Sequence, residues 1–192
     1  MSGKSLSDSH SFLALAKKRK TTYEFTPEKV KDSFINKILE AGRWAPSCSN
    51  TQPWHFVVIR DKNVIQKLMM TANYGDFHTD PPVLLALVLL KDRCPGKGLS
   101  CFRGKDSGVY DSYISVGMAA LNMTLQAAEL SVDSCIITPS QKEARKILKV
   151  RTSDAVPLLV GLGFQSPKTL QKARIRRPLS EIVSQEMFGG NR

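Results

Sequence analysis

The sequence contains no long apolar run, no CxxC pair and no internal repeat. Its longest apolar run, residues 83–90, has eight residues, whereas a helix that crosses a membrane needs roughly 20. The polar start of the chain and the short apolar stretch at 12–16 do not form a secretory signal. We therefore expect a cytoplasmic protein without a membrane span, and we interpret residues 83–90 as a buried strand.

Cysteine and histidine are scarce, with four and three residues respectively. Cys94 and Cys101 lie close together in a glycine-rich stretch, so a disulfide is one alternative there and a thiol-redox function another. The absence of a CxxC pair disfavours the thiol-redox function. A structural zinc ion needs four well-spaced Cys or His ligands, so we expect no metal site.

Positive charge is in excess, with 28 Lys and Arg against 17 Asp and Glu and a net charge of +11. This balance favours an anionic partner, and nucleic acid, an acidic surface and a phosphorylated cofactor all qualify. The basic residues gather at 17–20 and at 172–177, on either side of the apolar middle of the chain. No aromatic residue is interleaved with the second cluster, which argues against nucleic acid.

The length of 192 residues suits a single domain with its own hydrophobic core. Apolar spacing and capping residues predict helices over 11–19, 26–44, 64–72, 110–130 and 140–148. Apolar or β-rich runs predict strands over 56–60, 83–90, 132–137 and 156–164, with a loop over 92–106. Because the two kinds of element alternate without strict order, we expect an α+β or α/β fold with a mixed sheet.

The C-terminal tail, about residues 166–192, is basic and then weakly apolar. It has too few apolar residues to bury a core of its own. We therefore expect it to lie on another surface, that of a partner subunit. The whole chain, residues 1–192, is then one domain with an extended tail.

Polar residues gather between the second predicted helix and the first predicted strand, over residues 45–56. Asn50 and Gln52 carry side-chain amides, whose paired donors and acceptors match the edge of a flat heterocycle. A polar loop with a turn fixed by proline is the alternative interpretation of the same residues.

The order of these residues resembles the flavin-binding loop of the nitroreductase family, which has the pattern Pro-Ser-x-x-Asn-x-Gln-Pro-Trp. The matching residues are Pro46, Ser47, Asn50, Gln52, Pro53 and Trp54. The resemblance implies an α+β, three-layer fold in which helices flank a mixed, mainly antiparallel central sheet. It also implies that Asn50 hydrogen-bonds the ring of FMN and that Pro46 and Ser47 line it, often from across a dimer interface.

A second match lies at residues 19–25, beside the family pattern Arg-Arg-Ser-x-Arg-x-Phe. Arg19 and Lys20 stand at the paired basic positions and Thr21 at the Ser. A guanidinium holds a phosphate with two charge-assisted bonds, so Arg19 suits the FMN phosphate. Tyr23 stands where the family usually has a cation near the flavin, so we expect a lower flavin reduction potential unless Lys20 or a main-chain N–H substitutes.

Two further matches complete the resemblance. In the tail, a family pattern of basic residues before Pro-Leu implies that Arg174 and Arg176 return to the phosphate. Residues 134–139 correspond to the segment along the flavin face, which implies contacts from Ile136, Ile137 and Thr138. Thr138 replaces the glycine that is usual there.

The resemblance implies a homodimeric FMN-dependent oxidoreductase that takes a hydride from NADH or NADPH. Its acceptor is then a small molecule such as a nitroaromatic compound, a quinone or a free flavin. No side chain acts as a catalyst, because the chemistry takes place on the flavin. The alternatives are a flavin-binding or sensing protein with little turnover, and a basic protein that binds nucleic acid or another polyanion.

Overall fold

The computed structural model describes residues 11–72, 79–93, 107–169 and 173–189. Cys94, Cys101 and most of the loop expected at 92–106 lie outside these ranges. The described strands are β1 (Trp54–Ile59), β2 (Val83–Leu89), β3 (Asp133–Ile137) and β4 (Ala155–Gly163). The described helices are α1 (Phe12–Lys18), α2 (Asp32–Arg43), α3 (Lys62–Met69), α4 (Ser107–Glu129), α5 (Gln141–Leu148) and α6 (Leu179–Ile182), with short 3-10 turns η2 (Cys48–Asn50) and η3 (Lys91–Arg93).

The four strands form one sheet in the order β1-β2-β4-β3. Each neighbouring pair is antiparallel, which confirms the prediction of a mainly antiparallel sheet. A parallel contact is found at the isolated bridge between Thr21 and Ser134 on the outer side of β3. All seven residues of β2 are buried, as the uninterrupted apolar run predicts for an inner strand.

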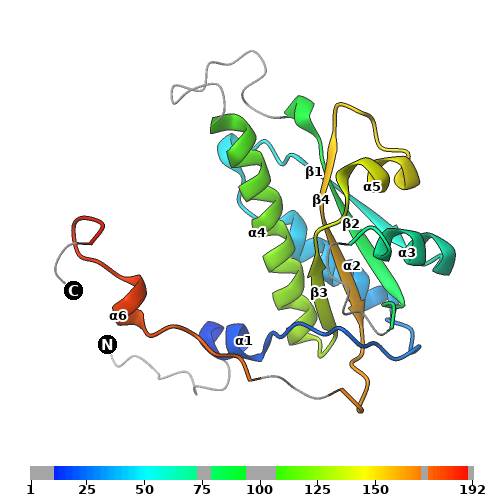
Figure 1. Ribbon diagram of the computed structural model, residues 1–192, viewed down its shortest axis with the longest axis horizontal. Helices are drawn as coiled ribbons and strands as arrows, with labels where there is room; N and C mark the ends of the chain where they lie inside the picture. Colours follow the sequence, from blue (N-terminus) through cyan, green and yellow to red (C-terminus); the bar gives the residue numbers. More distant parts are fainter. Residues whose placement is uncertain (1–10, 73–78, 94–106, 170–172, 190–192) are drawn as a thin grey trace.

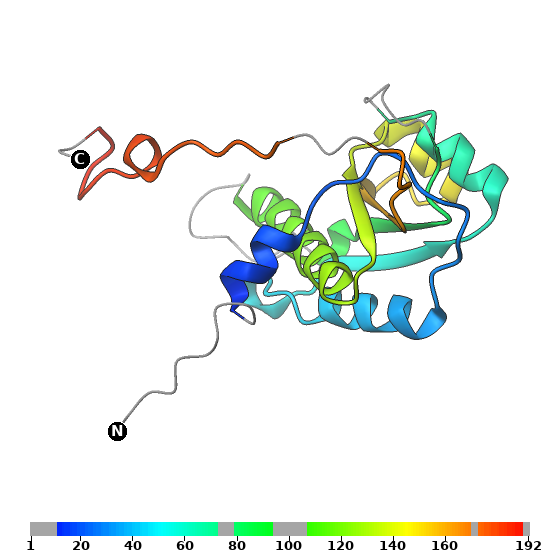
Figure 2. The ribbon, with the colours of Figure 1, turned by 90° about the horizontal axis from the view of Figure 1, so that it is seen from below.

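The sheet is the middle of three layers. Successive side chains of a strand point to opposite faces, and β2 follows this rule: Leu85 and Leu87 pack with side chains of α2 and α4. Leu84 and Ala86 pack instead with side chains of α3 and α5. Figures 1 and 2 show the corresponding arrangement, with α4 and α2 on one side of the sheet and α3 and α5 on the other.

The helix expected from residue 26 begins later than its local signals predict. Thr26 donates its main-chain N–H to the carbonyl oxygen of Phe164 at 2.8 Å, and Phe25 forms a bridge with Gln165. These bonds hold the segment extended, so α2 begins only at Asp32. Long-range main-chain pairing has overridden a good local cap, and the predicted start was wrong.

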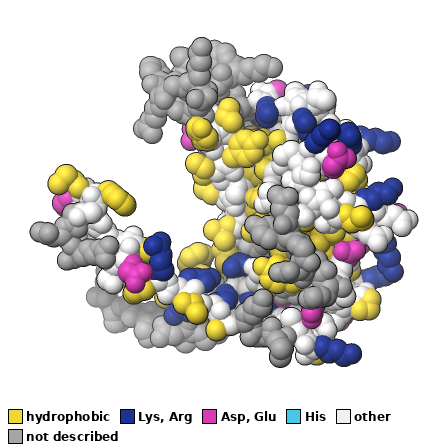
Figure 3. All heavy atoms as spheres, viewed as in Figure 1, with side chains coloured by type: hydrophobic (Ala, Val, Ile, Leu, Met, Phe, Trp, Pro, Cys, Tyr) yellow, Lys and Arg dark blue, Asp and Glu magenta, His cyan; other side chains and the backbone are white. Residues whose placement is uncertain are grey.

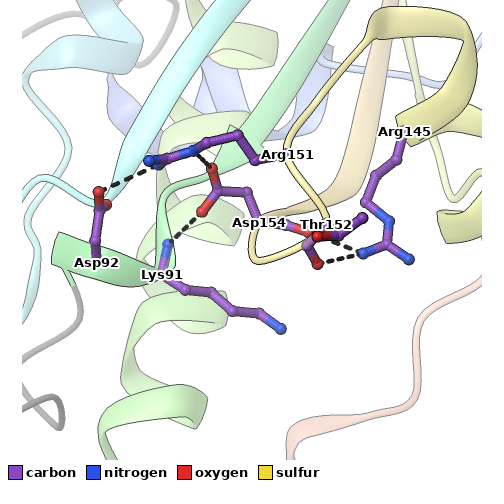
Figure 4. A network of polar contacts seen from close by, with 6 residues as sticks. All are labelled: Lys91, Asp92, Arg145, Arg151, Thr152 and Asp154. Atoms are coloured by element: carbon purple, nitrogen blue, oxygen red, sulfur yellow. Dashed lines mark hydrogen bonds and ion pairs between the residues drawn. The ribbon is translucent and has the colours of Figure 1, made fainter.

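A network of polar contacts joins the end of β2 to the turn before β4 (Figure 4). The carboxylate of Asp154, which is only 3% exposed, accepts from the main-chain N–H of Lys91 at 3.1 Å and from Arg151 Nε at 2.7 Å. Arg151 also pairs with Asp92 at 3.2 Å. The network fixes the point at which the chain leaves the sheet toward α4.

The described tail, residues 173–189, is exposed at every position. It leaves the body of the protein beside α1 and extends away from it, ending in α6 and a turn (Figure 1). The tail therefore does not pack on the core of its own chain. Contact with a partner subunit stays a prediction.

Candidate functional site

The two basic segments of the sequence meet at the end of α1. Arg174 donates hydrogen bonds from its guanidinium to the main-chain carbonyl oxygens of Lys17 and Arg19. Arg19 is the C-terminal cap of α1, so a cation of the tail stabilises the negative end of this helix. The structure therefore brings Arg19 and Arg174, two predicted phosphate ligands, into one cluster.

The arginine cluster has an excess of positive charge. Burial lowers the pKa of Arg19, and the positive charges of Arg174 and then Arg176 lower it further. Within the described part of the chain, no carboxylate lies within ion-pair distance of any of these three guanidiniums. Arg174 is held beside Arg19 by hydrogen bonds, and the charge of Arg176 acts on the same guanidinium. An anion would relieve the repulsion among these cations.

Lys20 differs from its neighbour because it has a partner. Its Nζ lies 3.7 Å from Oδ1 of Asp133, and Oδ2 of the same carboxylate accepts from the main-chain N–H of Gln165 at 2.8 Å. Sequence reasoning did not identify Asp133, because a pair separated by more than a hundred residues leaves no local signal. The ion pair shares the charge of Lys20, which weakens this lysine as a substitute for the cation missing at Tyr23.

Residues 21–23 run alongside the edge strand β3. Thr21 forms a bridge with Ser134, and the main-chain N–H of Thr22 donates to the carbonyl oxygen of Ser134 at 3.1 Å. Thr22 is 1% exposed, whereas Thr21 and Tyr23 on either side of it are exposed. The alternation of an extended chain thus places Thr21 and Tyr23 on the outer side.

The predicted residues at the end of β3, 136–138, divide in the same way. Ile136 and Thr138 are exposed, whereas Ile137 is fully buried and belongs to the core between the sheet and α3. The side chain of Ile137 is therefore out of reach of a ligand, and its main chain faces its paired residue in β4, Leu159. Because β3 is an edge strand, and because main-chain groups alternate along a strand, those of Ile136 point to the same side as those of Ser134.

Pro46, Ser47, Asn50 and Gln52 lie in the loop between α2 and β1. The loop is held by its own hydrogen bonds: the Oγ of Ser47 accepts from the main-chain N–H of Gln52 at 3.0 Å. Asn50 and Gln52 are exposed, and both have positive φ angles, 53° and 46°. Left-handed backbone at non-glycine residues is uncommon and often marks functional loops.

The structure of one chain does not bring this loop to the arginine cluster. The loop contacts α4 and lies beside the N-terminal part of that helix (Figure 1). The arginine cluster lies beyond the other end of α4, where Lys18 Nζ hydrogen-bonds Ser131 Oγ at 3.3 Å. A helix of 23 residues spans roughly 34 Å, so the two halves of the predicted site are separated within one chain.

A cavity of about 1000 Å³ is present elsewhere, at the far end of β1 from the loop. It is lined by Phe25, Ile65 and Val83, among others, and by none of the predicted site residues. Among the described residues, no three His, Cys, Asp or Glu side chains are grouped to hold a metal ion. None of the described helices is long and apolar enough to span a membrane.

A family model and a named relative both assign the chain to one family. Residues 16–72 match the model of the Nitroreductase family. A Staphylococcus saprophyticus protein that carries the name putative NAD(P)H nitroreductase is 44% identical, with 81% of this chain and 87% of the relative covered.

Two solved structures share the fold. A nitroreductase family protein of Clostridium difficile 630 has a TM-score of 0.77 and 26% identity, covering 93% of this chain and 99% of its own. A Desulfovibrio desulfuricans protein in complex with FMN has a TM-score of 0.74 and 25% identity, covering 92% and 96%. The three-layer fold expected from the sequence is thereby confirmed.

Proposed function

The chain belongs to the nitroreductase family, and we propose that it is an oxidoreductase that holds FMN and uses NADH or NADPH as the electron donor. The observation that carries this proposal is the meeting of Arg19, Arg174 and Arg176 with no carboxylate of the described chain within ion-pair distance. A dianionic phosphate would relieve the repulsion among the three guanidiniums. The Desulfovibrio relative in complex with FMN supports the choice of this cofactor.

The residues from the arginine cluster along the edge of β3 fit the successive parts of FMN. The guanidiniums suit its phosphate, and Thr21, two residues after Arg19, is exposed. Beyond it, the exposed side chain of Ile136 and the main-chain groups at the edge of β3 offer apolar contact and hydrogen bonds to a flat ring. The direction from Arg19 to Thr138 would thus follow the cofactor from phosphate to ring.

The loop between α2 and β1, which carries Asn50 and Gln52, would complete this site from a second copy of the chain. Exposed apolar side chains lie along one face of α4: Val109, Tyr110, Tyr113, Ile114 and Leu121. Gly117 lies on the same face, and a Cβ built on it would meet nothing within 4 Å. Figure 3 shows hydrophobic side chains gathered on the side of the body that faces the extended tail. A homodimer would cover this face and bring the partner's loop to the arginine cluster.

In this arrangement the chain binds and orients, and it provides no acid, base or nucleophile. Bound FMN would supply the redox chemistry, accepting a hydride and passing electrons to a small acceptor such as a nitroaromatic compound, a quinone or a flavin. The arginine cluster would anchor the phosphate, and Ile136 would pack against the ring. The exposed tail would extend over the partner and bury its apolar residues there.

A flavin-binding protein with little turnover is the second candidate, and one observation favours it. Tyr23 replaces the expected cation, and the nearby Lys20 shares its charge with Asp133. A site with less positive charge stabilises a reduced, negatively charged ring less well. Anaerobic titration with NADH and with NADPH separates the candidates, because a reductase bleaches the flavin absorbance within seconds to minutes and a passive binder does not.

The test of the proposed function is a visible absorption spectrum of the purified protein, followed by identification of any released chromophore. We expect a yellow protein that releases FMN, or a colourless one that becomes yellow with added FMN. A protein that neither contains nor takes up FMN would contradict the proposal. Binding of nucleic acid with a steep dependence on salt would then favour a polyanion-binding function instead.

A further inference from the structure

The side chains of Asn50 and Gln52 form an amide pair whose orientation can be deduced. The Nε2 of Gln52 lies 3.3 Å from the main-chain carbonyl oxygen of Asn50 and 3.1 Å from the Oδ1 of the same residue. A carbonyl oxygen only accepts hydrogen bonds, so the atom of Gln52 that faces it must be the NH₂ group. The atom of Asn50 that meets the same NH₂ group must then be the oxygen.

This pairing leaves the other end of the Asn50 amide facing away from Gln52. The Nδ2 of Asn50 carries two N–H donors, and no hydrogen-bond partner for them lies among the described residues. The main chain alone would not hold this arrangement, because Ser49, Asn50 and Gln52 all have positive φ angles of 46° to 53°. Such backbone persists only where surrounding bonds specify it, and the contacts of Gln52 to Asn50 and Ser47 are such bonds.

We propose that Gln52 is a positioning residue that fixes the Asn50 amide so that its N–H donors face an acceptor atom of the FMN ring. The inference rests on the proposed function and assigns Gln52 a different task from the direct contact with a flat heterocycle that its side-chain amide predicts. Gln52 uses its own amide NH₂ on Asn50, so it acts on the cofactor through that residue. The ring edge that Asn50 meets must present a carbonyl oxygen or an unprotonated ring nitrogen.

A double-mutant cycle on FMN affinity tests this relationship. Wild type, Asn50→Ala, Gln52→Ala and the double variant are titrated with FMN, and binding is followed by quenching of flavin fluorescence. We expect each single change to weaken binding about five- to tenfold, the value of one neutral hydrogen bond. We expect the double variant to bind as weakly as Asn50→Ala, within about twofold, because Gln52 has nothing left to position.

An isosteric change provides a second readout. Gln52→Glu keeps the size of the side chain but removes the NH₂ donor, so the Asn50 amide should turn round and present its oxygen to the ring. Gln52→Glu should then weaken the binding of uncharged riboflavin at least as much as Gln52→Ala, whereas a purely space-filling role would leave that binding unchanged. In the Asn50→Ala background the same substitution should change riboflavin affinity by less than about twofold.

Amide NMR of the flavin-free protein supplies a readout that does not depend on FMN. The side-chain NH₂ signals of Gln52 should shift in Asn50→Ala, and those of Asn50 should shift in Gln52→Ala. The exposed Gln66 on α3 serves as the control, and its signals should stay in place in both variants. Absence of these reciprocal shifts would overturn the amide pair.

The two proposals fail in different ways. Wild-type protein that binds no FMN overturns the proposed function, and the positioning role falls with it even if the NMR shifts are present. Wild-type protein that binds FMN, combined with single effects that multiply in the double variant, overturns only the positioning role, because Gln52 would then contact the flavin independently. A Gln52→Ala variant with wild-type FMN affinity also overturns the positioning role, because Gln52 would then contribute nothing to FMN binding.

Discussion

Arg174 and Arg19 are 155 residues apart in the chain, yet the guanidinium of the first donates a hydrogen bond to the main-chain carbonyl oxygen of the second. The bond ties the exposed tail to the C-terminal end of α1. It also keeps two guanidiniums close together although they repel, since the charge of Arg174 lowers the pKa of Arg19. The tail is thus held at the point where the proposed phosphate site needs its charge.

Replacement of Arg174 by alanine should weaken FMN binding about ten- to a hundredfold, the range expected when a charged hydrogen bond worth about 1.5–3 kcal/mol is lost. Riboflavin carries the same ring without the phosphate, so its affinity should stay within about twofold of that of wild type. Fluorescence titration with the two flavins measures both effects.

Arg177→Ala is the matched control for this prediction, because it removes the same charge from an exposed position of the same tail. It should leave the affinity for both flavins within about threefold of that of wild type, the effect of general charge alone. Equal losses for FMN and riboflavin in Arg174→Ala would contradict a phosphate contact. They would indicate that Arg174 only holds the tail in place.

Thr22 carries a hydroxyl that is buried without a hydrogen-bond partner in the described part of the chain. Thr22→Val should therefore raise the free energy of unfolding, by about 1 kcal/mol, because a group that prefers water is replaced by one that does not. Thr124→Val is the control, since Thr124 is equally buried but donates to the carbonyl oxygen of Leu121 at 2.9 Å. That change should lower the free energy of unfolding by about 1 kcal/mol.

Urea denaturation of the flavin-free protein measures both threonine variants under the same conditions. If Thr22→Val is as destabilising as Thr124→Val, the Thr22 hydroxyl has a partner after all, and the pairing of residues 21–23 with β3 needs revision. FMN titration of the same two proteins shows whether the change reaches the neighbouring Thr21.

Local patterns predicted the elements of the fold well, and long-range bonds explain where they did not. The apolar run from residue 83 predicts an inner strand because burial on both faces requires every side chain to be apolar, and β2 is buried throughout. The helix start at Thr26 was predicted from capping chemistry alone. The bond from its N–H to Phe164 joins residues far apart in the chain, and no local pattern contains that information.

In the candidate site, too, contiguous residues could be predicted from the sequence and long-range partners could not. The loop motif could be identified because its residues are contiguous, and the structure confirms that Asn50 and Gln52 share one loop. The partner of Lys20 could not be identified, because Asp133 belongs to a strand with which the first basic cluster pairs only after folding. The left-handed backbone at Asn50 was equally hidden, since non-glycine residues rarely adopt it.

Because the thiol of Cys135 is buried, we expect the free energy of unfolding to fall in alkaline solution. Burial raises its pKa from 9.0 to about 12, and the nearby charge of Arg19 opposes this only in part. A raised pKa means that the unfolded chain releases the thiol proton at a lower pH than the folded chain does. The stabilising effect is therefore fully present below about pH 9 and falls by at most about 1.4 kcal/mol per pH unit as the pH rises toward 12.

Comparison of wild type with Cys135→Ala isolates this contribution from that of other titrating groups. The variant lacks the thiol, so its unfolding free energy should fall less on going from about pH 8 to about pH 10, by roughly 1.4 kcal/mol. Urea denaturation at the two pH values provides the measurement. Equal losses in the two proteins would mean that the Cys135 thiol ionises as readily in the folded state as in the unfolded chain.

Ile114 is 58% exposed on the apolar face of α4, where a partner protomer would cover it. Ile114→Arg should leave the protomer folded, because the side chain does not enter its own core. It should weaken self-association by at least about 3 kcal/mol, or more than a hundredfold in dissociation constant, since an unpaired charge is buried at both copies of a twofold interface. Sedimentation at micromolar concentration should show half the mass of wild type.

Met70→Arg is the control for the dimer, since Met70 is 81% exposed just after α3, on the far side of the sheet from α4. It adds the same charge to an equally apolar position and should leave the mass unchanged. Because the loop with Asn50 would come from the partner, Ile114→Arg should also lose FMN on gel filtration, whereas Met70→Arg should retain it. An Ile114→Arg protein that is monomeric yet binds FMN as wild type does would show that one chain completes the site alone, and the proposed sharing of the site would be wrong.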